Sequence, residues 1–403
     1  MASQEVKEGY KLTDVGVIPE DWEVTLLDQV AKRGSGHTPD QAHPEYWNGN
    51  IKWISLKDSD RLDALYISDT VAKISKAGLE NSAAKIHPQG TVVLSRDAGV
   101  GKSAIMTDNM AVSQHFIAWV CSKYLNNHFL YYWLQKEKSE FERIAIGNTI
   151  KTIGLPYFQS LKIPLPPLEE QEKIAQVLSD FDSAIAHLDK LISKKRNIKQ
   201  GTMQQLLTGK KRLPGFSGKL QERKLGDLVE VVMGQSPDSK TYNTEEKGVP
   251  LIQGNADINN RKTVKRVWTT QATKLCNQGD VIMTVRAPIG AIGIASYDSC
   301  LGRGACLFKA KNINKLYLFY LMTFKEDIWE TIGQGSTFTA VNSNDIVNFN
   351  LSVPNYLAEQ KAIAQVLSDM DAEIEALEKK RDKYQAMKQG MMQELLTGKT
   401  RLK

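Results

Sequence analysis

The residues that most resemble a catalytic motif form a glycine-rich run at positions 99–103, Gly-Val-Gly-Lys-Ser. A phosphate-binding loop has the pattern G-x-x-x-x-G-K-[ST], and its first glycine would fall at position 96, where Arg96 stands. Gly302-Arg303-Gly304 is a lone G-x-G, which is far short of a dinucleotide fingerprint. These glycines therefore indicate turns, and we expect no nucleotide site on them.

Other catalytic signatures are missing from the sequence. A methyltransferase acting on amino groups would contain F-x-G-x-G and [DN]-P-P-[YF] loops, and neither is present. The six histidines form no H-x-H or H-E-x-x-H pattern, and the four cysteines form no C-x-x-C pair. No compact D…E-x-K cluster indicates a nuclease. We therefore expect no catalytic residue, no metal site and no cofactor on this chain.

An internal repeat organises the chain. Residues 170–213 align without a gap to residues 359–402, at a constant offset of 189, and 26 of the 44 positions are identical. Such a match over this length indicates a duplicated unit.

Both copies predict a long helix with a coiled-coil seam, because their apolar residues recur at alternating steps of four and three. About 40 residues at 1.5 Å each would span roughly 60 Å. Gly209 and Pro214 predict the end of the first helix. The seam residues are Ile174, Leu178, Phe181, Ile185, Leu188 and Ile192 in the first copy, and Ile363, Leu367, Met370, Ile374 and Leu377 in the second.

The charges along each copy run from acidic to basic. Residues 168–188 carry a net −4 and residues 189–212 a net +7, while 357–377 carry −4 and 378–403 carry +5. This order complements the helix dipole, which alone could explain it. It also suits an antiparallel pair, in which each acidic start faces the other helix's basic end.

The regions between the helices are weaker repeats of each other. Gly36-His37-Thr38-Pro39 matches Gly234-Gln235-Ser236-Pro237, and residues 90–96 match residues 279–286, each with a short β-branched run (91–94 and 281–284). Aromatic helices are expected at 129–134 and 317–322, with their aromatic residues in the core rather than stacked on a ligand. Short strands mixed with helices indicate two similar α/β domains of about 150 residues each.

The strings P-L-P-P-L-x-E-Q, I-A-x-V-L-x-x-x-D and L-L-T-G-K-x-R-L carry a specific resemblance. These strings occur around two variable domains. In this arrangement the chain resembles, over nearly its whole length, the specificity subunits of Type I restriction-modification enzymes. The second copy has Val353-Pro354-Asn355-Tyr356-Leu357 in place of the proline-rich entry, so its helix is expected to start differently. The resemblance divides the chain into a first target-recognition domain (1–167), a central long helix (168–212), a second target-recognition domain (213–356) and a C-terminal long helix (357–403).

The resemblance implies a pseudo-two-fold α/β protein whose two long antiparallel helices form a coiled coil. It also implies a non-catalytic subunit, in which each domain reads one half of a split, asymmetric site in double-stranded DNA. The helices would set the gap between the halves and dock methyltransferase subunits, two of them, and through these the restriction-translocase subunits. S-adenosylmethionine, ATP and Mg²⁺ would then belong to the partners.

Base edges are read by Arg or Lys on guanine, Asn or Gln on adenine, and Ser or Thr beside a methyl group. Such residues lie in stretches of the sequence typical of loops, and Arg96, Arg286 and Arg303, each close to a glycine, are the strongest candidates. The candidates of the first domain are Ser35, His37, Thr38, Ser55, Lys57, Arg96, Lys102, Gln114, His115, Asn148, Thr149 and Lys151. Those of the second domain are Gln235, Ser236, Gln253, Asn255, Arg286, Arg303, Gln334, Ser336 and Thr337. Two interpretations remain for the basic residues of the first long helix: they contact DNA phosphates, or they form a solvated helix face. These residues are Lys194, Lys195, Arg196 and Lys199.

The composition is consistent with this interpretation. The net charge of +6 mildly favours an acidic partner such as nucleic acid. No apolar run approaches the 18 or so residues needed to cross a membrane, and residues 1–22 contain no secretory signal, so a cytoplasmic protein is expected. Two alternatives remain: an autonomous enzyme acting on DNA, and a coiled-coil scaffold with no role on DNA.

Overall fold

The computed structural model describes residues 6–147, 151–334 and 340–403. The chain divides into two compact units. Unit 1 comprises residues 1–189 and 379–403, and unit 2 comprises residues 190–378. Each unit therefore contains one of the two related domains together with a part of both long helices.

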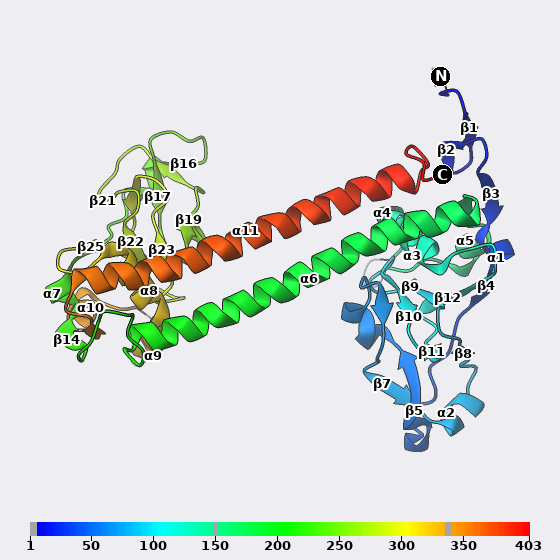
Figure 1. Cartoon of the computed structure of the whole chain (residues 1–403), viewed down its shortest axis with the longest axis horizontal. Helices are drawn as coiled ribbons and strands as arrows, with labels where there is room; N and C mark the ends of the chain where they lie inside the picture. Colours follow the sequence, from blue (N-terminus) through cyan, green and yellow to red (C-terminus); the bar gives the residue numbers. More distant parts are fainter. Residues whose placement is uncertain (1–5, 148–150, 335–339) are drawn as a thin grey trace. The chain divides into compact units, whose positions relative to one another are not determined.

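The two long helices are α6 (Leu168–Leu207) and α11 (Leu357–Leu395), coloured green and orange to red in Figure 1. They begin at equivalent positions of the repeat, so the expected difference in helix start is wrong. Each helix is followed by a glycine, Gly209 or Gly398, with a φ of +70°. A residue with a side chain rarely adopts this conformation, so the glycine ends the helix, and α6 stops short of residue 212.

Within each unit the two helices run antiparallel, as the charge pattern predicted. In unit 1, Lys388 near the end of α11 contacts Asp182 near the start of α6 at 2.5 Å. In unit 2, Lys199 near the end of α6 contacts Asp371 near the start of α11 at 2.5 Å. These ion pairs are equivalent under the repeat, so the acidic start of each helix faces the basic end of the other.

Two mixed sheets and two strand pairs form the domain of unit 1. The sheets have the orders β4-β12-β9-β10-β6 and β7-β5-β11-β8, and the pairs are β1-β2 and β3-β13. The strands are β1 (Tyr10–Thr13), β2 (Gly16–Pro19), β3 (Glu23–Leu26), β4 (Ala31–Gly34), β5 (Trp47–Ile54), β6 (Tyr66–Ile67), β7 (Ala72–Ile74), β8 (Ile86–His87), β9 (Val92–Ser95), β10 (Ser103–Met106), β11 (Met110–Val112), β12 (Phe116–Cys121) and β13 (Lys162–Leu165). The helices are α1 (Leu27–Val30), η1 (Pro44–Tyr46), η2 (Leu56–Arg61), α2 (Lys76–Glu80), α3 (Asn127–Lys136), α4 (Lys138–Ile144) and α5 (Leu155–Gln159).

The domain of unit 2 repeats this plan. Its sheets have the orders β15-β25-β22-β23-β19-β18 and β16-β20-β17-β24-β21, with β14-β26 as a strand pair. The strands are β14 (Gln221–Lys224), β15 (Val229–Met233), β16 (Tyr242–Asn243), β17 (Val249–Ile252), β18 (Ile258–Asn259), β19 (Lys262–Thr263), β20 (Trp268–Thr269), β21 (Leu275–Cys276), β22 (Val281–Thr284), β23 (Ile292–Ile294), β24 (Ser299–Leu301), β25 (Ala305–Ala310) and β26 (Asn350–Val353). The helices are α7 (Leu225–Leu228), η3 (Ser239–Thr241), η4 (Asn255–Asp257), α8 (Lys315–Phe324), α9 (Glu326–Gln334) and α10 (Ser343–Val347).

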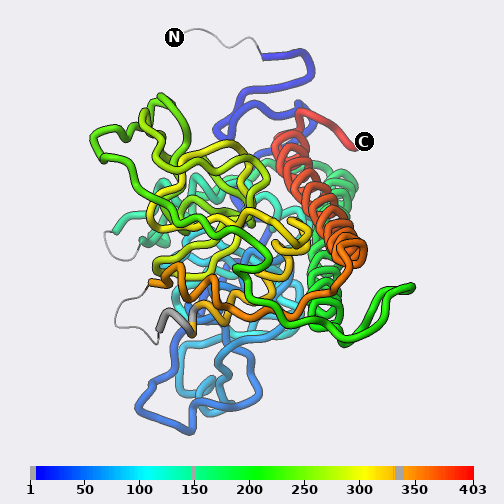
Figure 2. The backbone as a smooth tube through the Cα atoms, turned by 90° about the vertical axis from the view of Figure 1, so that its left-hand side faces the viewer, coloured from blue at the N-terminus to red at the C-terminus, as the bar shows by residue number. Residues whose placement is uncertain are grey.

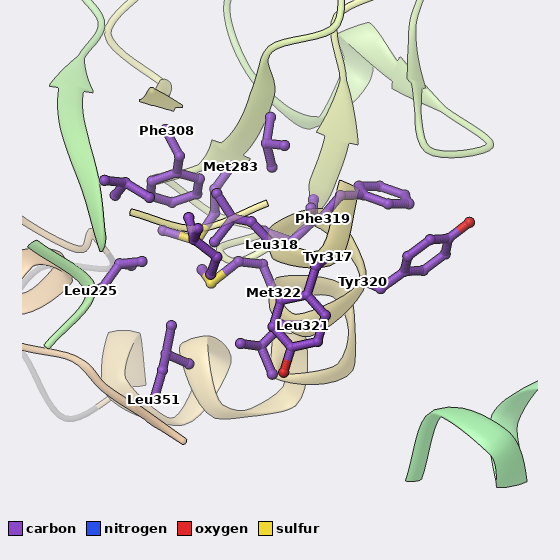
Figure 3. Close-up of a cluster of buried hydrophobic side chains, with 14 of the residues drawn as sticks. Leu225, Met283, Phe308, Tyr317, Leu318, Phe319, Tyr320, Leu321, Met322 and Leu351 are labelled. Atoms are coloured by element: carbon purple, nitrogen blue, oxygen red, sulfur yellow. The ribbon is translucent and has the colours of Figure 1, made fainter. Parts of the chain in front are cut away.

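The predicted aromatic helices are α3 and α8, and both lie in the core. Asn126 caps α3 and Asn314 caps α8 through their side-chain oxygens, which fixes the start of each helix. Figure 3 shows Met283, Leu318 and Met322 of unit 2 gathered between strand and helix, while Tyr320 points away from them. The Tyr320 hydroxyl donates to Asp371 of α11 at 2.8 Å, so the aromatic helix also holds the long helix.

The beginning of the predicted seam packs into the domain cores. In unit 1, Ile174 and Leu178 are fully buried in one cluster with Leu395 at the end of α11, the following Leu396 and the strands of the larger sheet. In unit 2, Ile363 and Leu367 occupy the equivalent places with Leu206 and Leu207. Burying one such side chain contributes about 1.5–3 kcal/mol. Each helix start is therefore built into its domain as well as paired with the other helix.

The first described strands lie beside the end of α11 in unit 1. The β1-β2 hairpin lies beside the end of α11, as Figures 1 and 2 show, and the Tyr10 hydroxyl donates to the carbonyl of Gly398 at 2.9 Å. In unit 2 the segment after α6 covers the equivalent helix end, since Leu220 packs against Gly209, the counterpart of Gly398.

Candidate nucleic-acid interface

Unit 2 contains a pocket lined by five of the residues predicted to read DNA. Ser236, Gln253, Asn255, Arg286 and Arg303 all contribute to it, together with Gly254, Ala287 and Gly304. They come from four separate loops, and the pocket has a volume of about 250 Å³. Guanidinium, amide and hydroxyl groups thus meet at one place, and these are the groups that recognise base edges.

Adjacent strands and close backbone contacts bring these loops together. Arg286 follows β22 and Arg303 precedes β25, and these strands pair with Thr284 opposite Ala305. The amide of Gly302 donates to the carbonyl of Ile252 at 2.7 Å, which ties the Arg303 loop to the end of β17. The amide of Arg303 itself donates to the Ser236 hydroxyl at 3.1 Å.

Gly304 is required by this close approach. A Cβ atom at this position would lie 1.9 Å from the carbonyl oxygen of Gln253, so replacement by alanine must push the two loops apart. We expect Gly304→Ala to destabilise unit 2 by about 1–3 kcal/mol and to weaken DNA binding, as chemical denaturation and gel shifts would measure. Gly254→Ala is the matched control, because it lines the same pocket with open space around its Cβ. Equal effects of both variants would contradict this explanation.

The equivalent loops of unit 1 form a hydrogen-bonded chain of side chains. The Thr38 hydroxyl donates to Gln114 at 2.7 Å, and the Gln114 amide lies 3.4 Å from the His115 ring. The other ring nitrogen of His115 lies 2.8 Å from Asp97, which also accepts from Arg96 at 3.4 Å. Four predicted residues thus belong to one hydrogen-bonded chain, in which the Asp97 carboxylate joins His115 to Arg96.

Asp97 is the residue of this site that the sequence did not reveal. Burial alone would raise the pKa of Asp97, but hydrogen bonds from Thr152 and His115 and the nearby Arg96 charge lower it below its ordinary value. A charged Asp97 therefore fixes the orientation of Arg96 and His115. The sequence does place this carboxylate directly after Arg96, which could have indicated that Arg96 has an acidic partner.

The other candidates of unit 1 have mixed environments. Ser55 is only 6% exposed and caps η2, so a structural role accounts for it. The Ser35 hydroxyl donates to the carbonyl of Phe116 at 2.7 Å, and Lys102 donates to the carbonyl of Ser59 at 3.1 Å. His37, Lys57 and Lys151 are exposed.

The remaining candidates lie partly outside what the structure describes. Gln235 is exposed and its backbone amide donates to Leu301. Gln334 ends α9, and its side chain is not among the described atoms. Asn148, Thr149, Ser336 and Thr337 lie outside the described residues.

The basic residues of the second half of α6 mostly serve the helix pair. Lys195 contacts Glu373 at 2.6 Å, and Arg196 contacts Glu378 at 2.5 Å, as Lys199 contacts Asp371. Of the four residues considered for phosphate contact, three are therefore held by carboxylates, and Lys194 is exposed.

The strings shared by the two copies form the same buried ion pair in both units. In unit 1, Glu170 of the E-Q string accepts from Arg401 of the second L-L-T-G-K-x-R-L string at 2.8 Å. In unit 2, Glu359 accepts from both ends of the Arg212 guanidinium. Both carboxylates are buried, Glu170 at 4% and Glu359 at 0% exposure. Each string therefore meets the string of the other copy.

The neighbouring glutamine of each E-Q string fixes the loop before the aromatic helix. The side-chain oxygen of Gln171 accepts from the amide of Asn126 at 2.9 Å, and that of Gln360 accepts from Asn314 at 2.8 Å. Both glutamines are buried. The repeated strings thus connect each domain to the helix pair.

Within the described ranges, no three His, Cys, Asp or Glu residues gather as a metal site would require. None of the described helices is both long enough and apolar enough to cross a membrane.

Comparison with known proteins places the chain in a family. Residues 19–195 and 218–384 match the model of the Type I restriction modification DNA specificity domain. In Methanocaldococcus jannaschii, the protein named as the MjaX specificity subunit of a type I restriction enzyme is 31% identical over 98% of both chains. The MjaVIII specificity subunit of the same organism is 28% identical over 96% of this chain and 94% of its own.

A solved structure has the same fold. The crystal structure of a Type-I restriction-modification S subunit from M. genitalium aligns with a TM-score of 0.62 and 15% identity, over 96% of this chain and 97% of that one. The matched family model covers both domains and most of both long helices. The chain therefore belongs to the specificity subunits of type I restriction-modification systems.

Proposed function

We propose that this chain gives DNA sequence specificity to a type I restriction-modification complex by reading a bipartite, asymmetric site. Each unit reads one half of the site in double-stranded DNA, unit 1 through the loops around Arg96 and His115 and unit 2 through the pocket around Arg286 and Arg303. The observation that carries this proposal is that equivalent loops of two related domains gather polar side chains of the types that recognise base edges, with different identities in the two domains.

The proposed complex supplies the chemistry that this chain lacks. Two methyltransferase subunits dock on the helix pair and neighbouring domain surfaces, and the restriction-translocase subunits join through them. S-adenosylmethionine, ATP and Mg²⁺ bind to those partners, and this chain catalyses no reaction itself. Acting on DNA together with them, it works in the cytoplasm.

The most direct test reads the methylation of host DNA by long-read sequencing, in cells with and without this chain. A split methylated motif is expected only in cells that contain the chain. Methylation by the purified chain alone would instead make it an autonomous enzyme.

A domain exchange tests the division of labour. Replacing residues 23–165 by the same domain of another specificity subunit should change one half of the motif and leave the other half and the spacer unchanged. A motif that is unaffected by the exchange would favour a scaffold with no role in reading DNA. Gel shifts at increasing salt provide a second readout, since phosphate contacts make binding weaken steeply with salt.

A further inference from the structure

The two arginines in the pocket of unit 2 have no acidic partner. Within the part of the chain that the structure describes, neither Arg286 nor Arg303 makes an ion pair or a side-chain hydrogen bond, and both are exposed. The pocket lining contains no aspartate or glutamate. Two guanidinium groups therefore face one small space in which nothing of opposite charge balances them.

The backbone that carries both arginines is nevertheless firmly held. The amide of Val285 donates to the carbonyl of Gly304 at 2.9 Å, which joins the two arginine loops directly. Arg286 forms a backbone bridge with Ala340, and the amide of Arg303 is fixed by Ser236. A fixed backbone with uncommitted guanidinium groups is suited to binding a ligand, because little order is lost when the ligand binds.

Unit 1 is different at the equivalent place. The Arg96 side chain is 20% exposed and is held by Asp97, whose other carboxylate oxygen contacts His115. An external acceptor would have to compete with Asp97 for the Arg96 guanidinium. Arg286 and Arg303 of unit 2 are therefore free to bind a ligand, whereas Arg96 of unit 1 is already paired with Asp97.

We infer that the pocket of unit 2 reads a guanine base, with Arg286 or Arg303 donating to its O6 and N7 atoms. This inference rests on the proposed function. Two parallel N–H donors match the O6 and N7 acceptors of guanine in the major groove. A phosphate would also accept from arginine, but Gln253 and Asn255 in the same pocket offer both donors and acceptors, which suit a base edge and add little at a phosphate.

Replacement by lysine separates these two ligands, because lysine keeps the charge but loses the two-pronged donor. Arg286→Lys and Arg303→Lys are made in the full chain in its host, with Arg286→Ala and Arg303→Ala beside them, and the methylated motif is read by long-read sequencing. Arg223→Lys on the exposed strand β14 is the matched control, since it lies outside the pocket lining.

The expected result is that at least one lysine variant accepts other bases at a single position that is G·C in the wild-type motif. Discrimination at that position should fall roughly tenfold or more, while the other half-site, the spacer and the control variant keep the wild-type motif. The alanine variant of the same residue should relax the same position.

Three results would overturn the inference. The motif is unchanged in all four variants, or the affected half-site contains no G·C pair. In the third, the alanine variants lower methylation equally at all sites of an unchanged motif, while the lysine variants keep wild-type methylation. A phosphate contact would give this result, because it needs only the positive charge. If instead the wild-type chain produced no sequence-specific methylation, the proposed function itself would fail.

Discussion

Replacing Glu359 by glutamine is expected to lower the free energy of unfolding of unit 2 by about 3 kcal/mol or more. Glu359 is fully buried and accepts from two nitrogens of Arg212. Among the described residues it is the only carboxylate that contacts Arg212, whose pKa it raises. Glutamine keeps the shape of the side chain but leaves a largely buried guanidinium without a counter-charge.

The equivalent Glu170→Gln change in unit 1 is expected to cost less. Arg401 also contacts Asp21 at 2.7 Å, and this contact with Arg401 lowers the pKa of Asp21 to about 2. A second carboxylate therefore remains for Arg401 when Glu170 is neutralised. The repeat supplies the same ion pair twice, but among the described residues a second carboxylate accompanies it in unit 1 alone.

Acid should remove the contribution of Glu170 in a predictable range. Burial alone would raise the pKa of Glu170, but hydrogen bonds from Arg401 and Trp22 hold it below the ordinary 4.5. A lowered pKa in the folded state means that the stabilisation is complete above pH 4.5 and disappears as the pH falls through the folded value. The stability difference between wild type and Glu170→Gln should therefore shrink below pH 4.5.

Hydrogen exchange, read separately for peptides of each unit, measures these changes without requiring the whole chain to unfold in one step. Glu378→Gln is the matched control in α11. Glu378 pairs with Arg196, whose side chain is 61% exposed, so its loss should cost less than about 1 kcal/mol. Equal costs for Glu359→Gln and Glu378→Gln would show that burial does not set the strength of the repeated ion pair.

The long helices could be predicted because their determinants are local and repeated. Heptad spacing, the acidic-to-basic order and a terminal glycine all lie within one segment, and α6 and α11 begin and pair accordingly. The buried strands around Val92 and Val281 were equally visible as short β-branched runs. What the spacing could not show is that Ile174 and Ile363 pack into the domain cores, since a seam and a core face have the same apolar period.

The loops proposed to read DNA were only partly predictable, because their chemistry depends on residues far apart in sequence. Ser236, Gln253, Arg286 and Arg303 were each chosen by type and glycine context, and folding brings them into one pocket. The same rule gave Arg96 equal weight, although Asp97 already holds it. Ser55 also satisfied the rule, but it is buried as a helix cap. Type and context identify potential readers, whereas partners and burial decide which of them are free.

Matched heptad insertions in both helices are expected to change the spacer of the DNA motif and to leave both half-sites unchanged. One heptad is placed after Asp189 in α6 and one after Glu378 in α11, at the boundary between the two units. The ion pairs of unit 1, such as Asp182 with Lys388, and those of unit 2, such as Lys199 with Asp371, each stay within their own unit. Only the length of helix that joins the units changes.

Seven residues add about 10 Å of helix, which corresponds to about three base pairs of B-DNA at roughly 34 Å per ten. Long-read sequencing of host methylation would show the new spacer directly. An insertion in α6 alone is the control: α11 then lacks the matching length, so the ion pairs of both units cannot stay aligned, and methylation should fall instead of moving to a new spacer. If the bases of a half-site changed while the spacer stayed the same, the helices would not set the spacing. Because every residue that we assign to reading lies in the domain loops and none in the inserted region, the proposal allows only the spacer to respond.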